Sequence, residues 1–165
     1  MVNKELTLQT LINLKATAER LIENSFKSIV SNNAVLKKQK GDRLDIKSEY
    51  EKLRKLYSQL QIIKMAIFTA NKKKNSIGIP NQQAIFEKSD LERELSMLNT
   101  MFSQKLHNRD GKQEDAYDFI IPKTEIEDRI VEIEERIKEL KQALTEFNQV
   151  TTMKIKIDTS LDLVK

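Results

Sequence analysis

The chain has 165 residues, of which 39% are hydrophobic and 33% charged, with only 3 glycines, 2 prolines and no cysteine. It is long enough to bury one core, too apolar for a disordered chain and too poor in turn residues for a sheet-rich fold. The missing cysteines exclude disulfides, thiolate metal sites and a cysteine nucleophile. We therefore predict a mainly α-helical protein.

The formal net charge of +4 is unevenly distributed along the chain. Residues 1–80 carry 16 basic and 7 acidic side chains, a net charge of +9, whereas residues 81–165 carry 13 and 18, a net charge of −5. Opposite charges favour packing of the two halves, within one chain or between neighbouring copies. Two separately solvated surfaces are the alternative interpretation.

No segment has the pattern of a membrane span or a signal peptide. The longest apolar run, near "MAIF" at 65–68, is far shorter than the roughly 20 residues needed to cross a bilayer. The first residues alternate polar and apolar side chains, unlike a signal peptide. We expect a soluble protein in the cytoplasm, or in a particle assembled there, because a cysteine-free chain suits a reducing compartment.

Two helices are predicted in the first half of the chain, over residues 7–30 and 44–71. Apolar residues recur every three or four positions in both, and Thr7 caps the first helix through its hydroxyl. In the second helix Leu56 and Ile63 widen the apolar stripe, which predicts packing against more than one neighbour.

A third helix is predicted from Asn81 to about Phe102, after the loop "NKKKNSIGIPN". The residues that follow it lose helical periodicity. The segment "YDFIIP" at 117–122 is short and rich in aromatic and β-branched residues, as strands are. We expect it to pair with a brief strand at 34–37, which gives a small two-stranded element.

The last predicted helix covers residues 124–148. Thr124 and Glu127 have the spacing of a capping box, in which each side chain satisfies a backbone N–H at the helix start. Its apolar residues follow at alternating steps of four and three, the spacing of a coiled-coil seam. The predicted helix-packing seam consists of Ile126, Ile130, Ile133, Ile137, Leu140, Leu144 and Phe147.

Apolar and polar residues alternate after this helix. Met153, Ile155 and Ile157 are separated by charged residues, a pattern of period two that indicates an edge strand or a tail that binds a partner. We predict one helical domain at 1–150 and a β-like tail at 151–165. The domain is expected to be an antiparallel helical bundle, or a set of coiled-coil hairpins, of about four helices.

The segments "AIFTANKKKN", "GIPNQQAIFEKSDLERELSMLNTM" and "DRIVEIEERIKELKQALTEFN", in this order, resemble the septicolysin-like family of small bacterial helical proteins. The resemblance covers roughly residues 6–150. Family members have asparagines near the ends of the second and last helices, matched by Asn71 and Asn148, but usually follow the latter with tryptophan where this chain has Gln149. The resemblance implies an antiparallel coiled-coil fold that self-associates, without an established enzyme activity.

No combination of residues predicts a catalytic or metal site. The single histidine, His107, stands in a polar loop, and a zinc site of the usual kind needs further histidines or cysteines. The sequence contains neither a phosphate-binding P-loop nor the glycine motif of dinucleotide-binding proteins. The sequence thus predicts no enzyme, no cofactor and no small-molecule substrate.

Two lysine-rich loops favour a second interpretation, the binding of nucleic acid. The chain has 22 lysines but 7 arginines, however, and no aromatic residue is interleaved with either basic run to stack on bases. The candidate nucleic-acid contacts are Lys37, Lys38, Lys40, Lys72, Lys73 and Lys74.

The seam, the charge difference and the tail together favour a non-enzymatic structural or assembly protein. We expect it to form a homo-oligomer through helical packing, or to be a component of a larger complex such as a phage virion or a similar particle. The candidate contacts between copies are apolar residues outside the main stripes and in the tail: Leu56, Ile63, Met153, Ile155 and Ile157.

Overall fold

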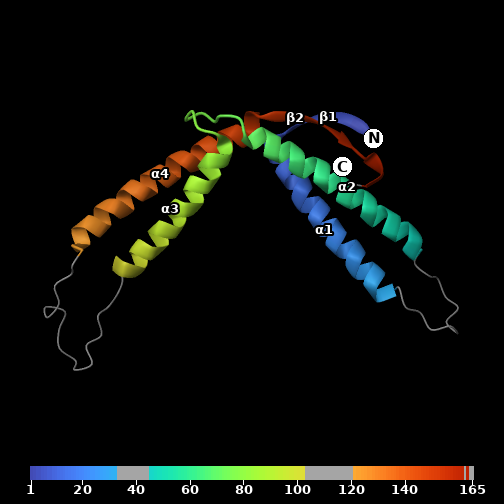
Figure 1. Ribbon diagram of the computed structural model, residues 1–165, viewed down its shortest axis with the longest axis horizontal. Helices are drawn as coiled ribbons and strands as arrows, with labels where there is room; N and C mark the ends of the chain where they lie inside the picture. The colour runs from blue at the N-terminus through green and yellow to red at the C-terminus, as the bar shows by residue number, and fades with distance from the viewer. Residues whose placement is uncertain (33–44, 103–120, 162, 164–165) are drawn as a thin grey trace, which may run out of the picture. The chain divides into compact units, whose positions relative to one another are not determined.

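In the computed structural model, residues 1–32, 45–102, 121–161 and 163 are described, and most of them are helical (Figure 1). They form the helices α1 (Leu8–Asn32), α2 (Ile46–Asn71), α3 (Asn81–Phe102) and α4 (Lys123–Val150), the strands β1 (Val2–Thr7) and β2 (Thr152–Ile157), and the short 3-10 helix η2 (Thr159–Leu161). The predicted class, mainly helical with about four helices and a small two-stranded β element, is confirmed for the described residues, and the observed sheet is antiparallel.

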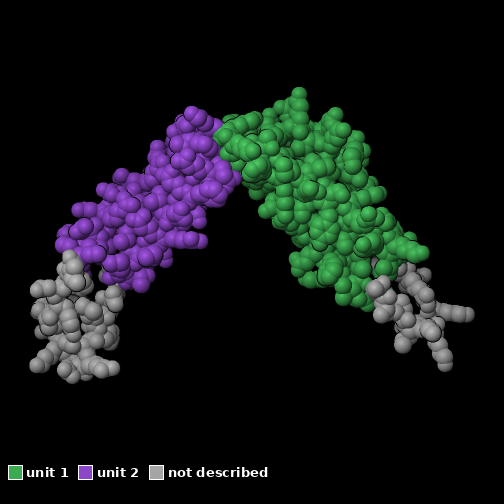
Figure 2. All heavy atoms as spheres, viewed as in Figure 1, with its two compact units in different colours: residues 1–73, 147–165 green, residues 74–146 purple. Residues whose placement is uncertain are grey.

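Two compact units divide the chain (Figure 2). Unit 1 consists of residues 1–73 and 147–165, and unit 2 of residues 74–146. The predicted organisation, one domain at 1–150 and a tail at 151–165, stays a prediction. The tail belongs to unit 1, because β2 pairs along its whole length with β1 at the start of the chain.

Local hydrogen bonds explain where the two helices of unit 1 begin. The hydroxyl of Thr7 accepts from the backbone N–H of Thr10 at 3.2 Å, which is the predicted cap of α1. At the start of α2, Asp45 accepts from the backbone N–H of Ser48 through its carboxylate, also at 3.2 Å. Each side chain satisfies a donor that the first turn of a helix leaves unpaired.

The two strands of unit 1 form an antiparallel ladder that runs from Val2 opposite Ile157 to Thr7 opposite Thr152. The predicted strand character of the tail is confirmed, whereas β1 was not predicted. The other predicted strands do not supply this sheet: residues 34–37 and 117–120 lie outside the described residues, and Ile121 and Pro122 are not in a strand. The alternation of polar and apolar residues at the start of the chain therefore belongs to a strand, β1.

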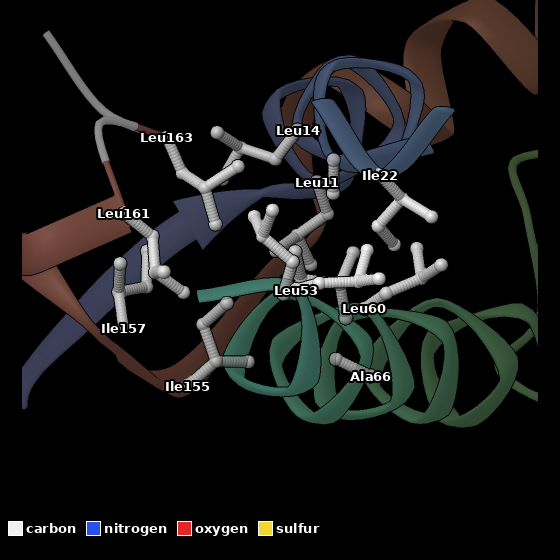
Figure 3. Close-up of a cluster of buried hydrophobic side chains, with 13 residues drawn as sticks. Leu11, Leu14, Ile22, Leu53, Leu60, Ala66, Ile155, Ile157, Leu161 and Leu163 are labelled. Carbon is white, nitrogen blue, oxygen red and sulfur yellow. The ribbon is translucent and has the colours of Figure 1, made fainter. Parts of the chain in front are cut away.

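The core of unit 1 lies between α1, α2 and the segment that contains β2 and η2 (Figure 3). Leucines and isoleucines from all three meet there, because the core faces of both helices converge on the inner face of the sheet. Side chains such as these contribute roughly 1.5–3 kcal/mol each when fully buried. The buried members are Leu11, Leu14, Ala18, Ile22, Leu53, Leu56, Leu60, Ile63, Ala66, Ile155, Ile157, Leu161 and Leu163.

Unit 2 is a hairpin of α3 and the greater part of α4, entered through a tight loop. In this loop Lys74 bridges to Pro80, the backbone N–H of Asn75 donates to the carbonyl of Ile79 at 2.9 Å, and Gly78 has a φ of 82°. The turn needs glycine at this position, because other residues rarely adopt a positive φ. The predicted loop before α3 is thus a defined turn.

The starts of α3 and α4 both use the carbonyl of a preceding proline. Pro80 accepts from the N–H of Ala84 at 3.1 Å, and Pro122 accepts from the N–H of Ile126 at 3.3 Å. Because α4 begins at Lys123, Thr124 lies inside its first turn and not at the cap position that the predicted capping box requires. The helix exists as predicted, but it starts one residue earlier.

Candidate interaction surfaces

The predicted seam of α4 forms the greater part of the core of unit 2. Ile126, Ile133, Ile137 and Leu140 are buried, and Ile130 is half-buried. Toward its C-terminus the buried stripe shifts by one position, since Ala143 is 1% exposed while Leu144 is only half-buried. The last seam residue, Phe147, belongs to unit 1, where it clusters with Leu8 and Ala70. The seam is therefore shared between two cores.

Ion pairs link the two helices of unit 2. The guanidinium of Arg136 donates to Glu87 of α3 at 2.6 Å, and that of Arg129 donates to Glu94 at 2.8 Å. A third pair joins Lys141 to Glu92 at 3.6 Å. Because antiparallel neighbours place these charges opposite each other, the pairs help to fix how α3 and α4 lie side by side (Figure 1).

Hydrogen bonds at these pairs change the ionisation of the groups involved. Hydrogen bonding to Glu87, and then to Glu139, raises the pKa of the Arg136 guanidinium. The ammonium of Lys88, one turn away on α3, lowers the pKa of Glu92 through a hydrogen bond. Both shifts favour the charged forms of these groups.

The residues predicted to join copies lie inside unit 1 and require a correction. Leu56 and Ile63 are 0% exposed, and Ile155 and Ile157 are 6% and 1% exposed. Met153 is half-buried against the same core. The wide stripe of α2 does pack against more than one neighbour, but these neighbours are α1 and β2 of the same chain. A contact between copies would therefore use other side chains.

A buried glutamine, which the sequence did not single out, joins α2 to the outer edge of β2. Gln59 is 2% exposed; its Nε2 donates to the carbonyl of Lys156 at 2.9 Å, and its Oε1 accepts from the backbone N–H of Asp158 at 2.9 Å. One amide side chain thus occupies two backbone groups that would otherwise stay open at this edge. β2 is fixed to α2 as well as to β1.

Of the candidate nucleic-acid contacts, Lys37, Lys38 and Lys40 lie outside the described residues. Lys72, Lys73 and Lys74 are exposed at the end of α2 and in the loop that follows. The ammonium of Lys72 lies over the ring of Phe68, 4.5 Å from its centre, and this ring is 50% exposed. The lysine run at 72–74 contains no aromatic residue, but the helix places the ring of Phe68 beside it.

Two exposed helix faces differ sharply in their charge. On α2, the face formed by Lys47, Tyr50, Arg54 and Tyr57 is called here the basic α2 face, and all four side chains are exposed. On α4, the face formed by Glu127, Asp128, Glu134 and Glu135 around the exposed Val131 is called the acidic α4 face. These four carboxylates have no ion-pair partner among the described residues.

The described residues contain no group of three or more histidine, aspartate or glutamate side chains that could hold a metal ion. His107 lies outside them. A hollow of about 310 Å³ in unit 1 is lined by Met1, Arg54, Lys55, Ser58 and Asp158, among others. It combines charged groups with a serine, and no histidine lines it.

The two asparagines that match the septicolysin-like pattern both lie in unit 1. Asn71 is buried at the C-terminus of α2, and Asn148 is half-buried near the end of α4.

None of the described helices is long and apolar enough to span a membrane. No family model, curated protein or solved structure matches the chain. The resemblance to septicolysin-like proteins therefore stays a prediction.

Proposed function

We propose that this protein is a non-enzymatic structural or assembly protein that associates with copies of itself, as a homo-oligomer or as a component of a larger particle. The observation that carries the proposal is the opposite charge of its two units. Unit 1 contains 18 basic and 9 acidic residues, a net charge of +9, and unit 2 contains 11 and 16, a net charge of −5. Each copy thus offers both members of a complementary pair.

Exposed apolar and aromatic side chains support the same proposal. Large exposed side chains of this kind, where they gather on one face, mark surfaces that bind other proteins. Tyrosine, phenylalanine and methionine are enriched in such interfaces relative to the rest of a protein surface. The side chains that are at least half exposed include Phe26, Val30, Tyr50, Tyr57, Met65, Phe68, Phe86, Met97 and Val131.

Light scattering after size-exclusion chromatography tests the proposal directly. At micromolar concentration and moderate salt, we expect a mass of two chains or more. Higher salt should lower the mass, because screening weakens attraction between exposed charges. A mass of one chain at every concentration and at low salt overturns the proposal.

A second candidate function, binding of single-stranded nucleic acid, is favoured by the contact between Lys72 and Phe68. Bases stack on exposed aromatic rings, and adjacent lysines neutralise phosphates, which releases counterions. The exposed ring of Phe68 and the lysines at 72–74 combine these two properties at one end of α2.

Fluorescence anisotropy with a labelled single-stranded oligonucleotide tests this second function. Phe68→Ala should weaken binding several-fold at all salt concentrations, whereas Lys73→Gln should weaken binding and flatten its salt dependence. Phe86→Ala, which removes a ring in unit 2 that is 60% exposed, is the control. If the unaltered protein does not bind at low salt, this function is excluded.

A further inference from the structure

We propose that the basic α2 face of one copy binds the acidic α4 face of a second copy. This inference rests on the proposed self-association and names the surfaces that carry it. The contact is heterologous, since it joins unlike surfaces, and each copy keeps one face of each kind free for the next neighbour. Assembly therefore continues from copy to copy, as a closed ring or as an open chain.

The basic α2 face lies apart from the side of the helix that holds unit 1 together. Leu53, Leu56 and Leu60 are buried against α1 and β2. Lys47, Tyr50, Arg54 and Tyr57 follow each other at steps of three, four and three, so they form their own row on the exposed side of the helix. Their outward position leaves them available to another molecule without unfolding of unit 1.

The composition of this row is that of an interface. Tyr50 and Tyr57 are 53% and 54% exposed, although tyrosine usually buries much of its ring in a monomer. Tyrosine and arginine are the side chains most often found at the energetic centres of interfaces, because they combine a flat apolar body with hydrogen-bond donors. Lys47 has no ion-pair partner among the described residues.

The acidic α4 face provides the complementary groups. Two arginines of α4 are already paired with carboxylates of α3, Arg136 with Glu87 and Arg129 with Glu94. The carboxylates of Glu127, Asp128, Glu134 and Glu135 are exposed and unpaired among the described residues, with Val131 between them 54% exposed. This face has acceptors in excess and one apolar side chain at its centre.

The spacing of the two faces matches. Lys47 and Arg54 are seven residues apart, as are Glu127 and Glu134, and the same holds for Tyr50 with Tyr57 and Asp128 with Glu135. Seven residues rise about 10.5 Å along a helix and return close to the same side. Two turns of one helix can therefore meet two turns of the other, with ammonium, guanidinium and phenol groups opposite carboxylates.

Contacts between two identical faces are disfavoured by the same charges. Two basic α2 faces, or two acidic α4 faces, would bring like charges together and repel each other. The existing pair of Arg54 with Glu51, at 3.4 Å, does not prevent the proposed contact, because both side chains are more than half exposed. Such surface pairs contribute little and exchange partners readily.

Charge reversal on each face separately tests this inference. One variant carries Lys47→Glu with Arg54→Glu, and the other carries Glu134→Lys with Glu135→Lys. Matched controls change the same number of charges elsewhere in each unit: Arg20→Glu with Lys154→Glu, and Asp90→Lys with Glu125→Lys. All these positions are exposed, so circular dichroism should show unaltered helix content in every variant.

We expect each face variant to run as a single chain at concentrations at which the unaltered protein assembles, with an apparent Kd raised about tenfold or more. The controls should retain assembly. A mixture of the two face variants should assemble again, because the acidic α2 face of one variant meets the basic α4 face of the other, and the native α4 and α2 faces that remain also meet.

The outcomes separate this inference from the proposed function. If the unaltered protein assembles but both face variants keep its mass, the assignment of these faces is overturned and self-association stands. If the face variants are single chains and their mixture also stays at the mass of one chain, the contact between unlike faces is overturned. An unaltered protein that is a single chain removes both proposals together.

Discussion

Each of the two units contains a pair of helices, but the contacts that hold the pair together differ between the units. In unit 1 a pair of helices is covered by β2 and η2, so that a large cluster of leucines and isoleucines is enclosed. In unit 2 no sheet lies against the pair of helices among residues 74–102 and 121–146, and Ala84 is the only apolar side chain buried among the described side chains of α3. Unit 2 instead uses one seam on α4 and three cross-helix ion pairs.

This difference predicts which kind of substitution destabilises each unit most. A helix hairpin without a third layer leaves much of each helix surface exposed. In unit 2 many of the exposed side chains are charged. A hairpin with a sheet against it buries more apolar area, which is the dominant favourable contribution to folding. We therefore expect unit 1 to be sensitive to lost volume, and unit 2 to salt and charge.

The largest expected effect is loss of volume in the core of unit 1. Leu56→Ala should lower the free energy of unfolding by about 3–5 kcal/mol, because Leu56 is 0% exposed between α1 and the sheet. Leu140→Ala, at a position that is also 0% exposed but in unit 2, should lower it by about 2–3 kcal/mol, since a two-helix core relaxes more easily. Urea unfolding followed by circular dichroism measures both, and a larger effect for Leu140→Ala would contradict the comparison.

A smaller effect is expected from the glutamine that fixes β2. Gln59→Leu keeps the side chain's approximate size but leaves the carbonyl of Lys156 and the N–H of Asp158 without their partner. We expect a loss of about 1–3 kcal/mol and faster hydrogen exchange of the Asp158 amide. Gln61→Leu, an exposed position on the same helix, serves as the control and should change stability by less than about 0.5 kcal/mol. Equal effects of the two substitutions would remove the special role of Gln59.

Unit 2 should respond to the loss of its charge pairs. Arg136→Gln removes the bonds to Glu87 and Glu139 and should lower the free energy of unfolding by about 1 kcal/mol or less, because these groups are partly exposed. The effect should shrink in high salt. Lys138→Gln, two residues away and without an ion pair among the described residues, is the matched control. A salt-independent loss would indicate that Arg136 acts through packing of its aliphatic part.

The two units should also differ in how salt affects their titration. In unit 1, hydrogen bonds from the hydroxyl and then the backbone N–H of Ser160 lower the pKa of Asp158. In unit 2, the bond from Lys88 lowers the pKa of Glu92. A lowered folded-state pKa contributes stability above the unfolded-state pKa, and this contribution is lost as the pH falls through the folded-state value. Both contributions therefore disappear on acidification.

Carbon-13 NMR titration at two salt concentrations separates these causes. High salt should move the pKa of Glu92 toward its ordinary value and leave that of Asp158 nearly unchanged, because neutral hydrogen-bond donors are not screened. Ser160→Ala should raise the pKa of Asp158 alone. If salt shifts both carboxyls equally, the pKa of Asp158 depends on nearby charges more than on Ser160.

The sequence predicted the helices well because their signals are local. Periodic apolar residues, the cap at Thr7 and the prolines before α3 and α4 act within a few residues, and all four helices lie close to their predicted ranges. The start of α4 differs by one residue, since the carbonyl of Pro122 opens the helix before Thr124.

What the sequence could not predict depends on residues far apart in the chain. The pairing of β1 with β2 places residue 2 opposite residue 157. A local sequence pattern can indicate a strand, but it does not show with which other strand it pairs. The pattern that widened the stripe of α2 correctly marked Leu56 and Ile63 as apolar contacts, but only the position of β2 shows that the contact is internal. Gln59 is missed for the same reason, because its two partners stand 97 and 99 residues away.

Zero-length cross-linking between isotope-labelled and unlabelled copies tests the central claim most directly. A carbodiimide joins a lysine to a carboxylate only when the two are in contact, and mixed-isotope products arise only between different chains. We predict mixed-isotope links from Lys47 to Glu127, Glu134 or Asp128, lost at high salt. Mixed-isotope links that join unit 1 only to unit 1, or links confined to chains of one isotope, would contradict the account.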